Sequence, residues 1–214
     1  MTGQRWEEAK SALRHLGKWA SQYDKDGIDI YFLNHRTTHG KHGYCNLQNA
    51  NEILKVLQQV WPSRGTPLGE RIREIMGQYL KECRSQSRWP FRSKRPKPIN
   101  VLVITDGCPM DAAENDLKEG IINAALQLDR MKMPLDQVGI SFVQIGDDEN
   151  AAEYLRELDD DLDKRGIRDM VDTTPYETNL SDDPEMLAKI LLGGINRRVD
   201  VKGGKVVVQR RNKK

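Results

Sequence analysis

Two short segments place oxygen donors where an α/β fold would bind a ligand. In the first, Asp106 lies within Thr105-Asp106-Gly107, directly after the all-apolar run 101–104. Such a run is typical of a strand buried on both faces of a parallel sheet, and ligands of open α/β sheets bind just beyond the carboxyl ends of the strands. The segment predicts a carboxylate that points into this crevice, and capping of a turn explains Asp106 equally well.

The second segment, Ser63-Arg64-Gly65-Thr66-Pro67-Leu68-Gly69, is a glycine-bearing loop that opens onto a helix. Thr is a good N-cap residue and Pro suits the first helical turn. Helix capping is therefore the simpler role for Thr66 when this segment is considered by itself.

Together, the strand ending in Ile104-Thr105-Asp106-Gly107 and the earlier helix start Gly65-Thr66-Pro67-Leu68-Gly69 resemble the von Willebrand factor A (vWA) domain. The resemblance covers roughly residues 1–197. In that family the two segments supply two of the three parts of the metal-ion-dependent adhesion site. The resemblance implies that Thr66 is a metal ligand and that Asp106 contacts the metal directly or through water.

The metal implied by the resemblance is Mg²⁺, with Mn²⁺ or Ca²⁺ as alternatives. Mg²⁺ takes octahedral oxygen ligands and keeps several waters. A hydroxyl, a carboxylate and an open position for an acidic group of a protein partner would form a bridge rather than a catalyst. The sequence near these segments offers no nucleophile paired with a general base. We therefore expect a protein–protein interaction module and not an enzyme.

The third part of the family's site, a D-x-S-x-S segment at the end of the first strand, is absent. The chain begins Met1-Thr2-Gly3-Gln4-Arg5-Trp6, which resembles the residues that follow that segment. We expect residues 1–197 to form a vWA-like domain without its first strand, which in the family lies between the strands matched by 28–33 and 101–104. Our hypothesis is that Met1 is an internal methionine of a longer product. With Thr66 and Asp106 as its protein ligands, metal binding would be weak or absent.

Two other functions stay open. A nucleotide-binding or hydrolytic enzyme on a similar doubly wound fold would need a phosphate loop, G-x-G-x-x-G or G-x-x-x-x-G-K-[ST], and neither occurs in the sequence. A truncated product without a working site is the other alternative.

Weaker signals each have a simpler explanation. The residues His35, His39, His42 and Cys45 suggest zinc, but their spacing matches no standard site and a polar hairpin is the simpler interpretation. The basic stretch 88–97, with Trp89 and Phe91, suggests nucleic acid, but a charged surface loop is favoured.

Further candidates lie near Asp106. The acidic run 147–149 follows a predicted strand and could face the same crevice, but acids also favour helix N-termini. Cys108 is either a reactive thiol or a buried, inert one.

Apolar periodicity predicts the elements that would position these residues. Helices are expected at 3–21, 53–60, from Thr66-Pro67 onward, and at 117–128, 150–162 and 186–195; strands are expected at 28–33, 101–104, 138–145 and 168–171, with a hairpin into 44–47. This alternation predicts an α/β fold with a doubly wound, mostly parallel sheet flanked by helices. Residues 198–214 would form a basic C-terminal extension.

The composition limits the environment and the partners. The 214 residues include 34 Lys or Arg and 32 Asp or Glu, for a net charge of +2. This balance gives no reason to expect nucleic acid or a membrane surface as partner. The odd count of 3 cysteines fits a reducing compartment. We expect a cytoplasmic protein, with the nucleus as alternative.

Overall fold

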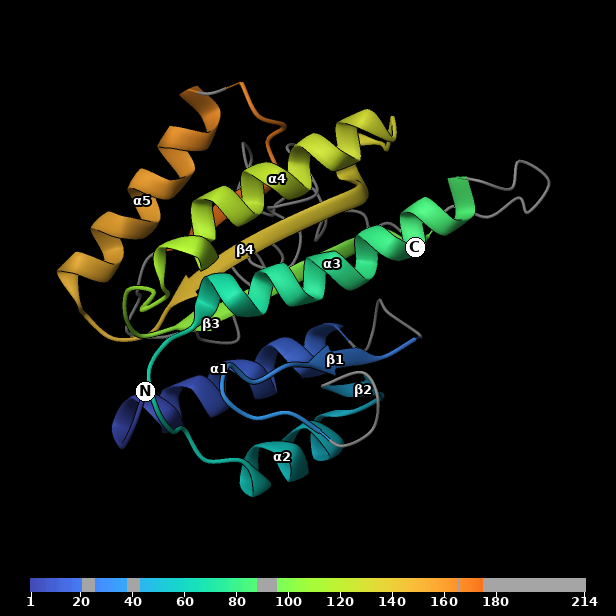
Figure 1. Cartoon of the computed structure of the whole chain (residues 1–214). Coiled ribbons are helices and arrows are strands. Elements are labelled where there is room, and N and C mark those ends of the chain that lie inside the picture. Colours follow the sequence, from blue (N-terminus) through green and yellow to red (C-terminus); the bar gives the residue numbers. More distant parts are fainter. Residues whose placement is uncertain (21–25, 38–42, 88–95, 165, 175–214) are drawn as a thin grey trace, which may run out of the picture.

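The computed structural model describes residues 1–20, 26–37, 43–87, 96–164 and 166–174, and it has an α/β fold (Figure 1). The helices are α1 (Gln4–Ala20), α2 (Ala50–Gln59), α3 (Leu68–Ser87), α4 (Leu117–Arg130) and α5 (Glu149–Lys164). The strands are β1 (Ile28–Ile30), β2 (Tyr44–Leu47), β3 (Ile99–Thr105), β4 (Val138–Gln144) and β5 (Val171–Thr174). Short 3-10 turns, η1 (Ala113–Asn115) and η2 (Leu135–Gln137), precede α4 and β4.

The strands form two separate sheets among the described residues. β3, β4 and β5 form a parallel sheet in that order, with Ile99 opposite Val138 and Thr105 opposite Gln144. β1 and β2 form an antiparallel pair, which confirms the predicted hairpin. In the described part of the chain, β3 is paired only with β4, so the hairpin is not joined to the parallel sheet.

The main core forms on one face of the parallel sheet. All seven residues of β4 are buried. The apolar run 101–104, predicted to be buried on both faces, lies in β3, where only Val103 and Thr105 are buried and the other residues are partly exposed. Ile140 and Phe142, which alternate along β4 and therefore point to the same face, pack with Val103 of β3. Apolar side chains of α3, α4 and α5 complete this core, which fixes the carboxyl ends of β3 and β4.

A second core joins α1, α2 and β1. Trp6 and Ala9 of α1 pack there with Ile53 of α2. The cluster also includes Ile104 of β3 and Ile145 just after β4, so α1 lies against the carboxyl ends of both strands. Figure 1 shows α1, α2 and the hairpin together on one side, with α3, α4 and α5 around the parallel sheet.

Two predicted strands had wrong bounds. The strand expected at 28–33 ends at Ile30, and the Arg36 guanidinium binds the carbonyl oxygens of Phe32 and Leu33, at 3.3 and 2.6 Å. These carbonyls accept from a side chain in place of a neighbouring strand.

The strand expected at 168–171 is instead Val171–Thr174. The guanidinium of Arg168, which is 8% exposed, binds the Asp129 carboxylate and the carbonyls of Met133 and Pro134. Arg168 therefore anchors the chain to the end of α4 before the strand begins. The predicted helix 186–195, the extension 198–214, most of the basic stretch 88–97 and the last part of the 1–197 domain lie outside the described residues.

Candidate functional site

Asp106 lies at the tip of β3, where the strand leaves the sheet. The carbonyl of Thr105 accepts the amide of Ile145 at 2.8 Å, which pairs the ends of β3 and β4. The Thr105 hydroxyl donates to the carbonyl of Gly107 at 3.0 Å, which closes a turn around Asp106. The Asp106 side chain is 15% exposed. The turn thus holds a mostly buried carboxylate at the carboxyl edge of the sheet.

The structure brings the loop of Thr66 beside the loop of Asp106. The amide of Met110 donates to the carbonyl of Thr66 at 2.8 Å. A Cβ added to Gly65 would lie 3.7 Å from the sulfur of Met110, an ordinary contact distance. The two predicted segments are therefore neighbours through their backbones.

Asp111, not Thr66, caps the N-terminus of α3. The Asp111 carboxylate accepts the amides of Gly69 and Glu70, at 2.8 and 2.9 Å. The carbonyl of Thr66 accepts the amide of Leu68 at 2.8 Å, and the helix begins at Leu68. The capping role considered for Thr66 is wrong, because a carboxylate from the other loop binds the first amides of the helix.

The N-terminus is the feature of this site that sequence reasoning missed. The ammonium nitrogen of Met1 lies 2.9 Å from Oδ2 of Asp106, and the two side chains are 13% and 15% exposed. Arg5 follows the same edge: its guanidinium lies against Gly146, where an added Cβ would come within 2.7 Å of Nε, and it binds Asp147 at 3.3 Å. The first turn of α1 therefore covers the carboxyl ends of β3 and β4.

The acidic run 147–149 has local roles. The Asp148 carboxylate accepts the amides of Asn150 and Ala151, at 2.9 and 3.1 Å, so it caps α5 as the helix-terminus interpretation predicted. Burial, and after it the negative charge of Asp148, raises the pKa of the Cys108 thiol. Because the thiolate is the reactive form, Cys108 is held in its less reactive state.

At this edge the described residues place one carboxylate, that of Asp106, against a cation. Within the described residues, no three His, Cys, Asp or Glu side chains gather in a group able to hold a metal ion. Asp106 nevertheless faces a positive charge, the Met1 ammonium, at 2.9 Å. A metal ion at Asp106 would have to draw most of its ligands from water.

The predicted zinc residues are only partly within the described chain. The His35 ring stacks on Tyr44, and its Nε2 lies 3.2 Å from the Tyr44 hydroxyl. The Cys45 thiol donates to the carbonyl of Gly43 at 3.9 Å. These contacts fit the hairpin interpretation, while His39 and His42 lie outside the described residues.

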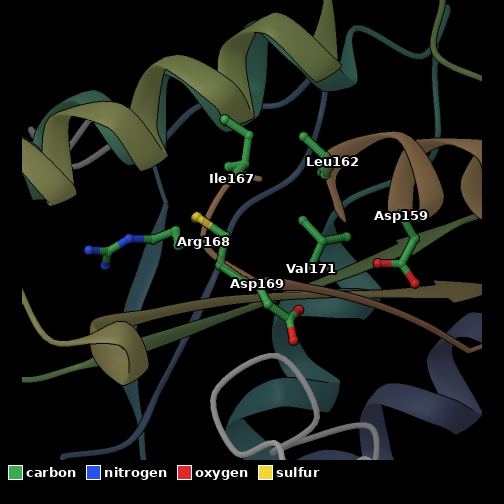
Figure 2. A pocket seen from close by; sticks show the side chains of 7 residues that line it. Asp159, Leu162, Ile167, Arg168, Asp169 and Val171 are labelled. Atoms are coloured by element: carbon green, nitrogen blue, oxygen red, sulfur yellow. The ribbon is translucent and has the colours of Figure 1, made fainter. Parts of the chain in front are cut away.

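A small hollow between the end of α5 and the start of β5 lies away from this edge (Figure 2). Asp159 and Asp169 line it, and Arg168 points away from both. Its volume is about 10 Å³, the space of about one water molecule. It is too small for an organic ligand.

The comparisons with known proteins give no family. No protein-family model, curated protein or solved structure matches the chain. The interpretation of the site therefore depends on its own geometry and on the resemblance in its two loops. None of the helices in the described ranges is long and apolar enough to span a membrane.

Proposed function

We propose that this chain is a protein-interaction module of the vWA type, in which Asp106 and Thr66 hold a divalent cation that bridges to an acidic group of a protein partner. The observation that carries the proposal is the meeting of the two loops at the carboxyl edge of β3. There the Met110 amide donates to the Thr66 carbonyl at 2.8 Å, and the Asp106 carboxylate lies 2.9 Å from the Met1 ammonium.

The chemistry of the two side chains suits this role. Asp106 would supply the negative charge and Thr66 a neutral hydroxyl, both hard oxygen donors of the kind that Mg²⁺ prefers. When bound, the cation would supply a positive centre for a partner's carboxylate. Since Asp106 is the one acidic residue of the two proposed ligands, affinity for the cation alone would be low.

The fold supports the same proposal in part. Asp106 follows a parallel strand, at the edge where α/β sheets bind ligands. We propose that the complete arrangement is doubly wound, as in vWA domains. The edge of β3 that faces away from β4 is where the resemblance puts the family's first strand, and no described strand pairs there.

The acid–base properties near the site support binding over catalysis. Burial raises the pKa of the Cys108 thiol, and burial raises the pKa of Tyr154 to about 12. Neither group is therefore prepared to act as a nucleophile or base at neutral pH. We propose no catalytic role, and we propose the cytoplasm, or else the nucleus, as the location.

Titration with Mn²⁺, a spectroscopic substitute for Mg²⁺, tests the proposal. Free Mn²⁺ is counted by electron paramagnetic resonance with the original chain and with Asp106→Asn and Thr66→Val. Binding should be lost in the first variant and weakened in the second, while the exposed Asp136→Asn control binds as the original does. Equal binding by all four chains would overturn the metal site.

The open position for a partner has its own measurement. Water bound to Mn²⁺ speeds the magnetic relaxation of solvent protons, and acetate can stand in for a partner's carboxylate. Adding acetate to the Mn²⁺-loaded chain should displace bound water and lower this relaxation. No change with acetate would remove the bridging role, even if Mn²⁺ binds.

A further inference from the structure

The ion pair between Met1 and Asp106 has the geometry of a built contact. Its nitrogen–oxygen distance of 2.9 Å is within the usual range for a charge-assisted hydrogen bond. Both side chains are more than four-fifths buried, so salt screens the pair less than it screens an exposed one. The pair therefore neutralises Asp106 within the fold.

The position of the ammonium is fixed by α1. Gly3 adopts a positive φ of 57°, and its carbonyl accepts the amide of Trp6 at 3.1 Å, which starts the helix. Trp6 is 8% exposed in the second core, and the Met1 side chain packs against the same cluster. Packing on both sides of Gly3 thus holds the amino group against Asp106.

We propose that the α-ammonium of Met1 is an internal cation for Asp106, and that it competes with a divalent cation for this carboxylate. The contact itself needs no metal, whereas the competition rests on the function proposed above. In a chain that begins at Met1 the nitrogen carries a positive charge. Wherever this nitrogen is part of an amide, the charge is gone and Asp106 is available to a metal ion.

The consequence is a site controlled at the N-terminus of the chain. A metal ion that binds Asp106 must displace the ammonium, and the free energy of that ion pair is subtracted from metal binding. An amide nitrogen can donate a hydrogen bond but does not neutralise the carboxylate. Forms with a free and with an amide-linked Met1 nitrogen therefore differ in cation affinity with the same Thr66 and Asp106.

The contact is tested by thermal melting without metal, in the presence of a chelator. Two forms are compared: the chain with Met1 as its first residue, checked by mass spectrometry, and a chain with Gly-Ser joined before Met1. The extension should lower the melting temperature by about 2–4 °C, as expected for one partly buried ion pair in a chain of this size.

The same extension in two variant chains shows whether the fall in melting temperature depends on Asp106. In Asp106→Asn the extension should have little effect, because the ion pair is already broken. In Asp147→Asn, which removes the exposed partner of Arg5, the extension should have its full effect. The same loss in the Asp106→Asn background as in the original chain would overturn the contact, and with it the proposal.

The competition is tested by Mn²⁺ titration of the same chains. The extended chain should bind Mn²⁺ about five- to tenfold more tightly, which corresponds to about 1–1.4 kcal/mol, and Asp106→Asn should remove binding in both forms. Equal affinity of the two forms, with binding still lost in Asp106→Asn, overturns the competition and leaves the proposed function standing. Absence of Mn²⁺ binding in every form, with the melting result intact, overturns the metal site and the competition but not the Met1–Asp106 contact.

Discussion

The amide of Met110 donates to the carbonyl of Thr66 across 2.8 Å, and this bond joins the loop after β3 to the loop before α3. Asp111, the next residue, caps α3 with its carboxylate. A backbone hydrogen bond from Met110 and side-chain hydrogen bonds to Asp111 thus connect the same pair of loops. Because both candidate ligands lie on these loops, their relative position depends on these hydrogen bonds.

Replacing Asp111 with Ala should remove the side-chain hydrogen bonds between the two loops and lower the stability of the fold. The amides of Gly69 and Glu70 would lose their acceptor, at a cost of about 1 kcal/mol in the free energy of unfolding. For a chain of this length the melting temperature should fall by about 2–4 °C. Glu114→Ala, at an exposed acid nearby, serves as the control and should change little. Similar melting of both variants would mean that the cap carries no stability.

Gly69 is required by a close approach and not by a turn. A Cβ at this position would lie 2.0 Å from the carbonyl oxygen of Asn115, so Gly69→Ala should cost about 1–3 kcal/mol. Gly77 in the same helix is the matched control, since an added Cβ there meets nothing within 4 Å. Gly77→Ala should stabilise by about 0.5–1 kcal/mol, because Ala is the better helix former. Urea unfolding measures both, and effects of the same sign would contradict the packing of α3 on η1.

The long elements could be predicted because their signal is local. The helix expected at 3–21 is found at Gln4–Ala20, and the strand expected at 138–145 at Val138–Gln144. In both, apolar spacing over many residues reports which face is buried. The short strands were less well placed, since side chains such as Arg36 and Arg168 bind backbone carbonyls beside them.

The partners at the candidate site could be predicted only in part. The sequence identified Asp106 and the loop of Thr66, because strand tips and glycine-bearing loops leave local patterns. It did not identify Asp111 as the cap of Gly69, a contact between residues 42 positions apart. Nor did it place the Met1 ammonium on Asp106, because tertiary packing of α1 creates that ion pair and no local spacing reports it.

Arg71 links α3 to the segment that follows β1. Its side chain is 2% exposed, forms an ion pair with Glu74, and lies with its guanidinium carbon 5.2 Å from the centre of the Tyr31 ring. Removing a buried partner of this kind costs about 3–5 kcal/mol, and the Arg36 side chain, which also binds Glu74, offsets part of the loss. We expect Arg71→Ala to lower the free energy of unfolding by about 2–4 kcal/mol. The exposed Arg73→Ala control should cost far less, and equal losses would argue against a special role for Arg71.

The raised pKa of Tyr154 predicts that the folded chain loses stability at alkaline pH. Burial, and after it the charges of Asp116 and Asp111, raises its pKa from 10.0 to about 12. Between these two pH values the Tyr154 phenol has lost its proton in the unfolded chain but keeps it in the folded one. The contribution of Tyr154 to the free energy of unfolding is therefore complete below about pH 10 and is lost as the pH rises to about 12. Tyr154→Phe should therefore lose stability less steeply across this range, with little change at neutral pH. If urea unfolding shows the same loss of unfolding free energy in both chains as the pH rises, the raised pKa is not that of Tyr154.

The charge of Asp148 should control how fast Cys108 reacts. Burial and then this charge raise the pKa of the thiol. Asp148→Asn removes the charge but keeps a side-chain oxygen that can cap α5. The pKa of Cys108 should fall, and alkylation by iodoacetamide at neutral pH should quicken severalfold, because the thiolate is the nucleophile. The exposed Asp136→Asn serves as the control, and mass spectrometry of peptides reads Cys45, Cys83 and Cys108 separately. An unchanged rate at Cys108 removes the electrostatic explanation, whereas a rise that includes the fully buried Cys83 shows that the fold has opened instead.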